Sequence, residues 1–186
     1  MAKKPTSQQA VPEVTLRPVT AEDEAFLFKV YRSTRAEEMA LTGWLEVEKR
    51  AFLKMQFQLQ SASYKQQYPN AEHVIILFAG QPAGRMMVDR TQADELRGVD
   101  IAILPEFRNA GVGSFLIKGM LDEATGAGIP FRIMVERFNH KALRLYERLE
   151  FSYHGETDTH IAMEWSMKRE PSKNRSTTQK KHARAK

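Results

Sequence analysis

The stretch with the clearest capacity for chemistry is a glycine-containing turn, residues 108–114, with the sequence Arg-Asn-Ala-Gly-Val-Gly-Ser. It follows a short apolar run in which Val99, Ile101 and Ile103 alternate along the chain, a pattern typical of a β-strand. Pro105 ends that strand because proline has no N–H to donate to the ladder. Helically spaced apolar residues come directly after the turn. A strand, a turn and a helix start in this order gather unpaired N–H groups near the positive end of the helix dipole. The turn is therefore predicted to hold a diphosphate.

Two well-known phosphate loops do not fit this turn. A nucleotide P-loop needs Lys and then Ser or Thr after its last glycine, whereas Ser114 and Phe115 follow Gly113 here. A dinucleotide fingerprint needs a third glycine near the position of Phe115. Gly111 and Gly113 carry no Cβ, so a phosphate can come close to the backbone, and Arg108 can add a fork of donors. On glycine chemistry alone, an ordinary tight turn before a helix stays open as an alternative.

Two segments together carry a family resemblance. The pattern Arg-x-x-Gly-x-Gly, placed after an apolar strand, resembles the acyl-CoA-binding motif of the GNAT (Gcn5-related N-acetyltransferase) superfamily. Residues 135–151 resemble the strand–Asn-x-x-Ala-x-x-x-Tyr–helix segment of the same superfamily, which usually ends in Gly-Phe. Glu150 stands where that glycine would be, which puts the geometry of the turn after the helix in question. The resemblance extends over about residues 14–167, and both motifs occur in the expected order.

The resemblance implies an acyl-CoA-dependent N-acyltransferase with acetyl-CoA as cosubstrate and no metal. The acceptor would be a primary amine of a small molecule, peptide or protein, and it would attack the thioester directly in a ternary complex. The chain has no cysteine, so it offers no obvious nucleophile for an acyl-enzyme. By resemblance, coenzyme A would contact the main chain of the strand, the turn and the next motif, namely Ile101, Ala102, Ile103, Leu104, Arg108, Asn109, Ala110, Gly111, Val112, Gly113, Ser114, Asn139, Ala142 and Tyr146.

Three side chains are candidates for catalysis. Tyr146 lies two helical turns after Asn139, and its phenol can protonate the departing CoA thiolate at neutral pH. The alternatives are that Tyr146 only packs the helix on the sheet and that Asn139 is only a helix cap. A base must also accept a proton from the acceptor ammonium. Asp100 and Glu136 are tentative candidates for that base, although an Asp at a strand end can simply be bonded to a loop.

Composition narrows the class of protein. The 28 Lys and Arg residues exceed the 23 Asp and Glu residues by five in a chain of 186 residues. Residues 168–186 carry eight Lys or Arg against Glu170, so the basic character resides in this tail and the rest of the chain is slightly acidic. The absence of cysteine excludes disulfides and thiolate zinc sites. With no apolar run of membrane-spanning length and no secretion signal, we expect a cytoplasmic protein that does not bind membranes.

The predicted architecture is an α/β (α+β) GNAT fold with four helices and a mixed, largely antiparallel sheet of six or seven strands whose central pair is splayed. We expect a flexible leader at 1–12, the acyltransferase domain at 13–167 and a disordered basic tail at 168–186. A helix near residues 26–31 comes first. The next helix is expected to bury one face formed by Phe52, Met55, Leu59 and Ala62, followed by an irregular loop over residues 64–70.

The acceptor specificity is predicted to reside in residues 20–70 and in the turn at 156–158. Four carboxylates there could attract a cationic amine, Glu37, Glu38, Glu46 and Glu48, and three aromatic residues could line a pocket or belong to the core, Trp44, Phe57 and Tyr64. Four histidines have no metal-ligand spacing and are interpreted as surface or cap residues, His73, His140, His154 and His160. The sequence leaves the acceptor, the acyl chain length and the oligomeric state open, a homodimer included.

A second class of function remains as an alternative. The fold could serve as a catalytically weak module that senses CoA or associates with nucleic acid, with the basic tail neutralising phosphates. Nucleic acid is expected as a partner of the tail only. Deletion of residues 168–186 separates the two hypotheses, because it leaves acyl transfer intact if the tail is an accessory.

Overall fold

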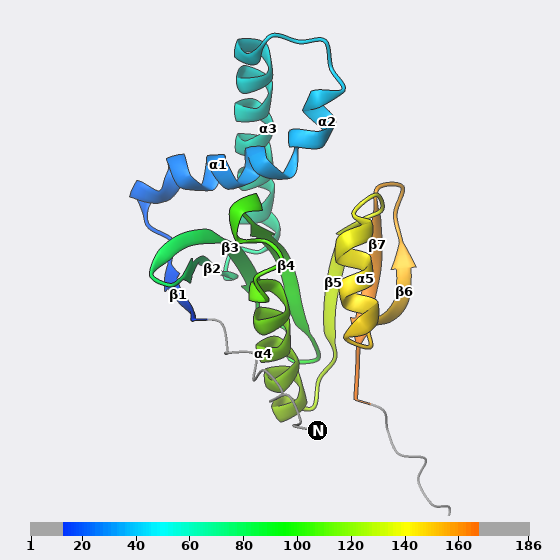
Figure 1. The fold of residues 1–186 in the computed structure, drawn as a ribbon. Helices are drawn as coiled ribbons and strands as arrows, with labels where there is room; N and C mark the ends of the chain where they lie inside the picture. The colour runs from blue at the N-terminus through cyan, green and yellow to red at the C-terminus, as the bar shows by residue number, and fades with distance from the viewer. Residues whose placement is uncertain (1–12, 168–186) are drawn as a thin grey trace, which may run out of the picture.

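The computed structural model describes residues 13–167, which form one seven-stranded sheet with helices packed on it (Figure 1). The strand order is β1-β2-β3-β4-β5-β7-β6, and all neighbours are antiparallel except the parallel pair β4 and β5. The strands are β1 (Val14–Pro18), β2 (Glu72–Phe78), β3 (Gln81–Asp89), β4 (Leu96–Ile103), β5 (Phe131–Glu136), β6 (Ser152–Glu156) and β7 (His160–Trp165). The predicted mixed, largely antiparallel sheet is confirmed. The predicted leader and basic tail lie outside the described residues.

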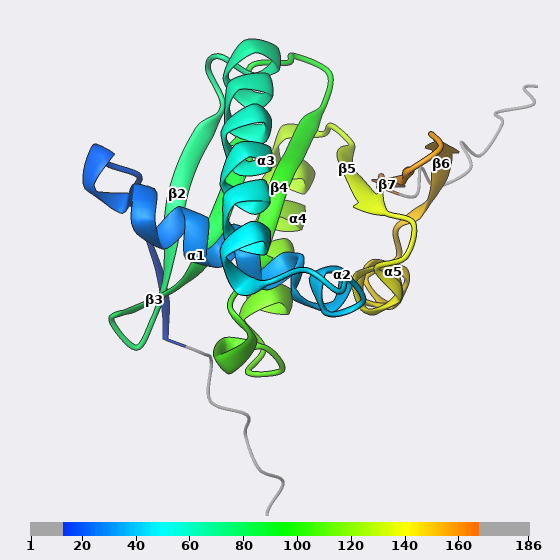
Figure 2. The same ribbon diagram turned by 90° about the horizontal axis from the view of Figure 1, so that it is seen from above.

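Five α-helices and two 3₁₀ turns connect these strands within residues 13–167. Four helices were expected, and the additional one is the short α2. The helices are α1 (Glu24–Thr34), α2 (Ala36–Ala40), α3 (Glu46–Gln67), α4 (Val112–Ala127) and α5 (His140–Arg148), with 3₁₀ turns at Ala21–Asp23 and Pro105–Phe107. Figures 1 and 2 show α1, α2 and α3 grouped at the β1–β4 half of the sheet, and α5 beside β5 and β7.

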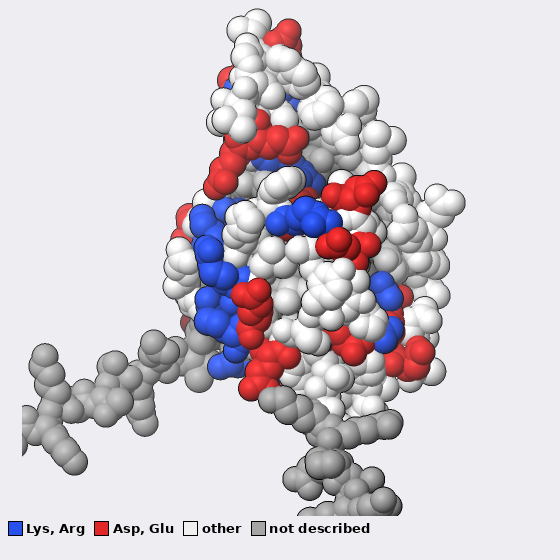
Figure 3. Space-filling model, turned by 90° about the vertical axis from the view of Figure 1, so that its right-hand side faces the viewer, with Lys and Arg blue, Asp and Glu red and all other residues white. Residues whose placement is uncertain are grey.

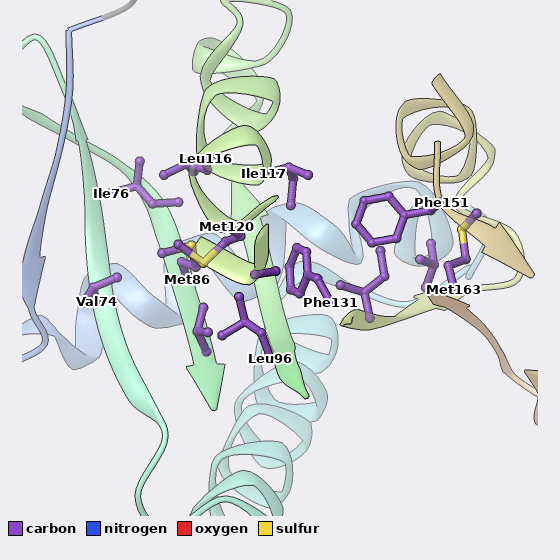
Figure 4. Packing of buried hydrophobic residues seen from close by; sticks show 14 of the residues in the cluster. Val74, Ile76, Met86, Leu96, Leu116, Ile117, Met120, Phe131, Phe151 and Met163 are labelled. Carbon is purple, nitrogen blue, oxygen red and sulfur yellow. The ribbon is translucent and has the colours of Figure 1, made fainter. Parts of the chain in front are cut away.

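The two faces of the sheet pack on different helices. The apolar run of β2 is buried on both faces, as its sequence predicted: Val74 and Ile76 pack in the cluster with α4, and Ile75 packs with α1 and α3. The larger cluster continues across the sheet. Figure 4 shows Phe131 of β5 between α4 and Phe151, and the two phenyl rings meet edge to face with centroids 5.5 Å apart. This core joins the two halves of the sheet.

The sheet opens between β4 and β5. Only three residue pairs join these strands, from Leu96 with Phe131 to Gly98 with Ile133. Gly98 allows this close pairing, because a Cβ there would lie 2.9 Å from the Ile133 side chain. The register between β3 and β4 then shifts, which leaves Val99 as an extra residue on β4. Beyond this bulge β4 runs on to Ile103 without pairing to β5, so the predicted splayed pair is present.

The sequence prediction for α3 was wrong in both its buried face and its length. Met55 and Leu59 are 48% and 58% exposed, whereas Leu53 and Phe57 are buried against α1 and β2. The helix also continues through the predicted loop to Gln67, because residues 65–67 favour helix and the break comes only at the residue before Pro69. Tyr64 is therefore a helical residue.

The end of α5 keeps a glycine-type turn without a glycine. Glu150 adopts a left-handed conformation with φ of 65°. The Phe151 amide donates to the Tyr146 carbonyl and the Glu150 amide to the Glu147 carbonyl, both at 3.0 Å, which is a Schellman motif. The rings of Tyr146 and Phe151 supply its apolar contact, with centroids 5.2 Å apart. The turn that the substitution put in question is thus formed.

Candidate active site

The glycine turn before α4 presents a row of unpaired amides. Asn109 and Gly111 have positive φ values of 62° and 82°, which bend the chain into the helix. Among the residues that the structure describes, no acceptor bonds the amides from Asn109 to Ser114, and the first helical bond of α4 is donated by Phe115. Six consecutive N–H groups at a helix N-terminus form a site for an anion. The turn therefore has the donors that the sequence predicted.

The side chains nearest to Gly113 come from β4 and α5. A Cβ built on Gly113 would lie 3.5 Å from Cδ1 of Ile103 and 3.7 Å from Cδ2 of Leu145, which is ordinary van der Waals contact. The protein's own packing therefore does not require glycine there, whereas close approach of a phosphate does. Arg108 is partly engaged, because its Nε donates to the Ile103 carbonyl at 2.8 Å. Its two terminal nitrogens remain for an anion.

Of the four strand residues that the sequence assigned to coenzyme A, only two turn their main-chain groups toward the opening of the sheet. The Leu104 amide donates to the Ala83 carbonyl, and hydrogen-bonded pairs alternate along an antiparallel ladder. The main chains of Ala102 and Leu104 therefore face β3, and those of Ile101 and Ile103 face the opening toward β5. Since Arg108 occupies the Ile103 carbonyl, the groups left for a ligand are those of Ile101 and the Ile103 amide.

Helix α5 brings the second motif to the other side of the opening. Asn139 caps the helix, its Oδ1 accepting from the Ala142 amide at 3.1 Å, as the capping interpretation predicted. Tyr146 is half-buried, and its hydroxyl makes no hydrogen bond within residues 13–167. Burial, and secondarily the nearby Asp100 carboxylate, raise the pKa of Tyr146 to about 12. The phenol is thus protonated at neutral pH and able to donate.

A cavity of about 490 Å³ passes through the opening and connects both faces of the sheet. On one face it is lined by the α5 motif, and on the other by the C-terminal part of α3. Residues predicted as functional that line it are Asp100, Ile101, Ala102, Glu136, Asn139, Ala142 and Tyr146, and residues not predicted as catalytic that line it include Arg35, Gln60, Tyr64, Arg85, Arg97, Thr157 and His160. The volume lies in the range of small-molecule sites.

Both candidate bases are held by an arginine. Nε of Arg85 lies 2.6 Å from Oδ2 of Asp100, and an Nη of Arg35 lies 2.6 Å from Oε1 of Glu136. The Arg35 guanidinium also lies over the Tyr31 ring, 5.7 Å from its centroid. Asp100 is thus not bonded to a loop, which was the alternative reading of its position. The two carboxylates lie on β4 and β5, on opposite sides of the opening.

Sequence reasoning missed the residues that surround these carboxylates. Arg85 lies on the central strand β3, and a charged residue inside the apolar run from Ala83 to Val88 was a signal that could have revealed it. Tyr64 was recognised as a possible pocket residue and lines the cavity, but Phe57 is in the core and Trp44 packs on Phe52. The predicted acidic attractors do not line this cavity, namely Glu37, Glu38, Glu46 and Glu48.

Two of the four histidines, His73 and His160, are half-buried instead of lying on the surface as predicted. His160 is half-buried at the start of β7 and lines the cavity, and His73 is half-buried on β2 with its pKa lowered, first by burial and then by Arg85. In the part of the chain that the structure describes, no group of three or more His, Asp or Glu side chains could hold a metal ion. No helix among residues 13–167 is long and apolar enough to cross a membrane.

The family is decided by comparison with known proteins. The model of the acetyltransferase (GNAT) family matches residues 38–151, which is more than half of the chain. The chain belongs to the GNAT acetyltransferase family. As a GNAT protein it is an acyl-CoA-dependent N-acetyltransferase, which confirms the resemblance carried by the two motifs. No curated protein sequence matches this GNAT chain.

Solved structures share the GNAT fold at low sequence identity. The PaiA N-acetyltransferase of Thermoplasma acidophilum, in complex with coenzyme A, is 16% identical with a TM-score of 0.62, covering 83% of this chain and 99% of that one. The ribosomal-protein-S18-alanine N-acetyltransferase of Escherichia coli is 17% identical with a TM-score of 0.57, covering 87% and 98%. Campylobacter jejuni PseH, in complex with acetyl coenzyme A, is 16% identical with a TM-score of 0.51, covering 83% and 99%.

Proposed function

We propose that this GNAT protein transfers the acetyl group of acetyl-CoA to a primary amine by direct attack in a ternary complex. The observation that carries the proposal is the row of free amides from Asn109 to Ser114. This row does not line the cavity itself, but its Gly113 lies next to the Leu145 side chain of α5, the helix that carries Tyr146 into the cavity. The amides and Arg108 would bind the diphosphate. The free main-chain groups of Ile101 and Ile103 would bind the pantetheine arm, with the Asn139 side chain opposite. The cosubstrate supplies an activated thioester.

The protein's own groups would manage the protons of the transfer. As the neutral amine attacks the carbonyl carbon and the C–S bond breaks, the Tyr146 hydroxyl would donate its proton to the departing thiolate, and the proton that the attacking nitrogen loses as the amide forms would restore the phenol. The proton lost from the acceptor ammonium would pass to Asp100 or Glu136, directly or through water. Both carboxylates line the cavity that holds Tyr146, and each lies on a different strand. The acid would thus lie on α5, and the base would lie either across the opening on β4, if it is Asp100, or on the neighbouring strand β5, if it is Glu136.

Two measurements test this proposal. Isothermal titration should show acetyl-CoA binding, and a panel of primary amines should then release free CoA thiol. Steady-state kinetics should give intersecting double-reciprocal lines, because direct transfer requires both substrates to be bound together. Parallel lines would contradict direct attack and indicate an acyl-enzyme. Binding of acetyl-CoA without acetylation of any amine would contradict the proposed transfer and favour a CoA-sensing module.

A further inference from the structure

A buried arginine with unused donors lines the acceptor side of the cavity. The Arg85 side chain is only 6% exposed, and just one of its nitrogens makes an aligned hydrogen bond, Nη2 to Oε1 of Gln60 at 2.9 Å. Nε is engaged by Asp100, whose Oδ2 lies 2.6 Å away although not along the N–H direction. Nη1 makes no hydrogen bond within residues 13–167, and guanidinium groups in protein interiors normally have all their donors satisfied. The Nη1 donors of Arg85 therefore remain for an acceptor that the described part of the chain does not supply.

Arg85 does not stand alone in the cavity, because a phenol and a second ion pair line the same space. Tyr64 is half-buried on α3, and its hydroxyl makes no hydrogen bond within the described residues. Tyr64 lines the same cavity as the two ion pairs, Arg85 with Asp100 and Arg35 with Glu136. Burial is the main cause of its raised pKa, so the phenol is a neutral donor. Two ion pairs and one free phenol thus surround the acceptor space.

The charge balance of this space selects among acceptors. Arg85 with Asp100, and Arg35 with Glu136, are matched pairs, and Arg97 is paired with the buried Glu95. A polyamine would bring two or more positive charges to a cavity lined by three guanidinium groups, which opposes its binding. A simple anion would meet two carboxylates. A molecule with one positive and one negative group is matched to such pairs. Figure 3 shows both acidic and basic side chains on the surface seen from the β6 and β7 side, with the basic ones gathered mainly along one edge of the view.

The strand order fixes how such a molecule would lie. Asp100 is on β4, which borders the opening, and Arg85 is on β3, one strand further away. An ammonium placed against Asp100 would therefore face the thioester, and a carboxylate placed against Arg85 would point away from it. The charges of an α-amino acid are separated by about the length of one hydrogen bond, which matches the 2.6 Å Arg85–Asp100 pair. The amino acid would then lie antiparallel to the Arg85–Asp100 pair, with its ammonium against Asp100 and its carboxylate against Arg85.

From this arrangement we infer that the acceptor is a zwitterionic amine of the α-amino acid class, whose carboxylate is bound by Arg85. The inference rests on the proposed acetyl transfer and specifies its substrate. The carboxylate would accept from Nη1 of Arg85, with the Tyr64 hydroxyl as a further donor, while Nε stays paired with Asp100. After transfer, the product would be an N-acetylamino acid and free CoA. Arg85 is thus a specificity-determining residue, and Gln60 is a positioning residue that holds it.

The test compares matched acceptors on the full-length enzyme. Acetylation of the twenty common amino acids is measured by thiol release, and the best acceptor is compared with its carboxamide and its decarboxylated amine. We expect kcat/KM for the free acid to exceed that for either analogue by about 10- to 100-fold, as expected for a lost charged hydrogen bond. An equal or better carboxamide, or a decarboxylated amine that equals the acid, overturns the inference and leaves the proposed transfer standing.

Two variants assign the effect to Arg85. Arg85→Lys keeps the charge but loses the fork, so it should lower kcat/KM for the acid about tenfold or more and change that for the carboxamide little. Arg90→Lys is the matched control, because Arg90 follows β3 but is paired with Glu72 and Glu123 outside the cavity. An equal loss for acid and carboxamide in Arg85→Lys contradicts the assignment. If that variant does not fold, the acid-to-carboxamide ratio of the wild type still decides. If other primary amines are acetylated but no amino acid is, the inference is overturned and the proposed transfer stands. If no primary amine of any class is acetylated with acetyl-CoA bound, the proposed function is overturned as well.

Discussion

Two properties make Tyr146 available to a departing thiolate: its ring is fixed by an edge-to-face contact with Phe151, and its hydroxyl has no partner within residues 13–167. Its pKa, raised to about 12 by burial, keeps the phenol neutral but also makes it a weaker acid than a free tyrosine. These properties come from its position two residues before the end of α5, where the Schellman turn holds it. The same aromatic pair therefore terminates the helix and orients the candidate acid.

We expect Tyr146→Phe to separate chemistry from binding. The variant keeps the ring contact and loses only the hydroxyl, so kcat at saturating acetyl-CoA should fall by about 10²- to 10⁴-fold. The dissociation constant of acetyl-CoA, measured by titration calorimetry, should change by less than about threefold. An unchanged kcat in the variant would remove the acid role, and a loss confined to acetyl-CoA affinity would make Tyr146 a binding residue.

Glu150 occupies a conformation that costs a residue with a Cβ about 1–2 kcal/mol. Glu150→Gly should therefore raise the free energy of unfolding, by about 0.5–1 kcal/mol after the greater chain entropy of glycine is subtracted. Gly128 provides the reciprocal control at the end of α4, where φ is 68° and a Cβ would meet no atom within 4 Å. Gly128→Ala should lower stability by a similar amount. Urea unfolding of both variants checks these signs, and a destabilised Glu150→Gly would show that the Glu side chain stabilises the turn.

At the scale of elements, the sequence predicted the order of strands and helices well because each was marked locally. The alternating apolar residues of β4, the Asn139 cap and the glycines after α4 each depend on neighbours in the chain. The buried face of α3 was not predictable in this way. Two stripes of similar hydropathy compete on that helix, and the correct one begins with Leu53 and Phe57 but continues into the polar cavity residues Gln60 and Tyr64.

The sequence pointed to the parts of the candidate site that are contiguous in the chain. It did not reveal the parts formed by side chains that are far apart in the chain and meet only in the fold. The turn at 108–114 and the α5 motif are contiguous in sequence, so their types and spacing identify them. The pairing of Arg85 with Asp100 depends on the register of β3 against β4, and that of Arg35 with Glu136 joins residues a hundred positions apart. A single sequence contains no local signal for either pair.

A cluster of ion pairs lies at the end of β4 and β5 where the two strands are paired, called here the closed end. Glu95 is only 6% exposed and is ion-paired with Arg97 of β4 and with Arg132 of β5, and Arg132 also contacts Glu164 of β7 at 2.7 Å. The side chains of Arg97 and Arg132 are about one-third exposed, so solvent screens part of their attraction. The cluster nevertheless links three strands at the point where the sheet begins to open.

We expect Glu95→Gln to weaken this closed end. Removing one partner leaves two arginines facing each other, and with the screening taken into account the free energy of unfolding should fall by about 2 kcal/mol. Glu72→Gln is a control, since Glu72 pairs with Arg90 at an exposed site and should cost less than about 1 kcal/mol. Thermal and urea unfolding measure both. Equal effects of the two substitutions would show that the Glu95 cluster contributes no more than a surface pair.

At the scale of the whole molecule, the described domain consists of two half-sheets joined at one end. Three residue pairs between β4 and β5, the Glu95 cluster and the core around Phe131 join the halves β1–β4 and β5–β7. Figures 1 and 2 show β4 and β5 diverging from this junction. The open end carries all the groups proposed to bind coenzyme A, with the diphosphate donors on one half and the α5 motif on the other. Coenzyme A would therefore act as a bridge between the halves.

This arrangement predicts a hydrogen-exchange response that depends on which part of the cosubstrate is present. The amides of Asn109–Ser114 have no acceptor among residues 13–167 and should exchange rapidly in the free protein. Coenzyme A should slow their exchange and also that of the α5 half, because it contacts both sides of the opening. Pantetheine, which lacks the diphosphate, should slow exchange in α5 without affecting residues 109–114. Protection of the 109–114 amides by pantetheine, or none with coenzyme A, would show that these amides do not hold the diphosphate, and the direction of binding across the sheet would have to be reversed.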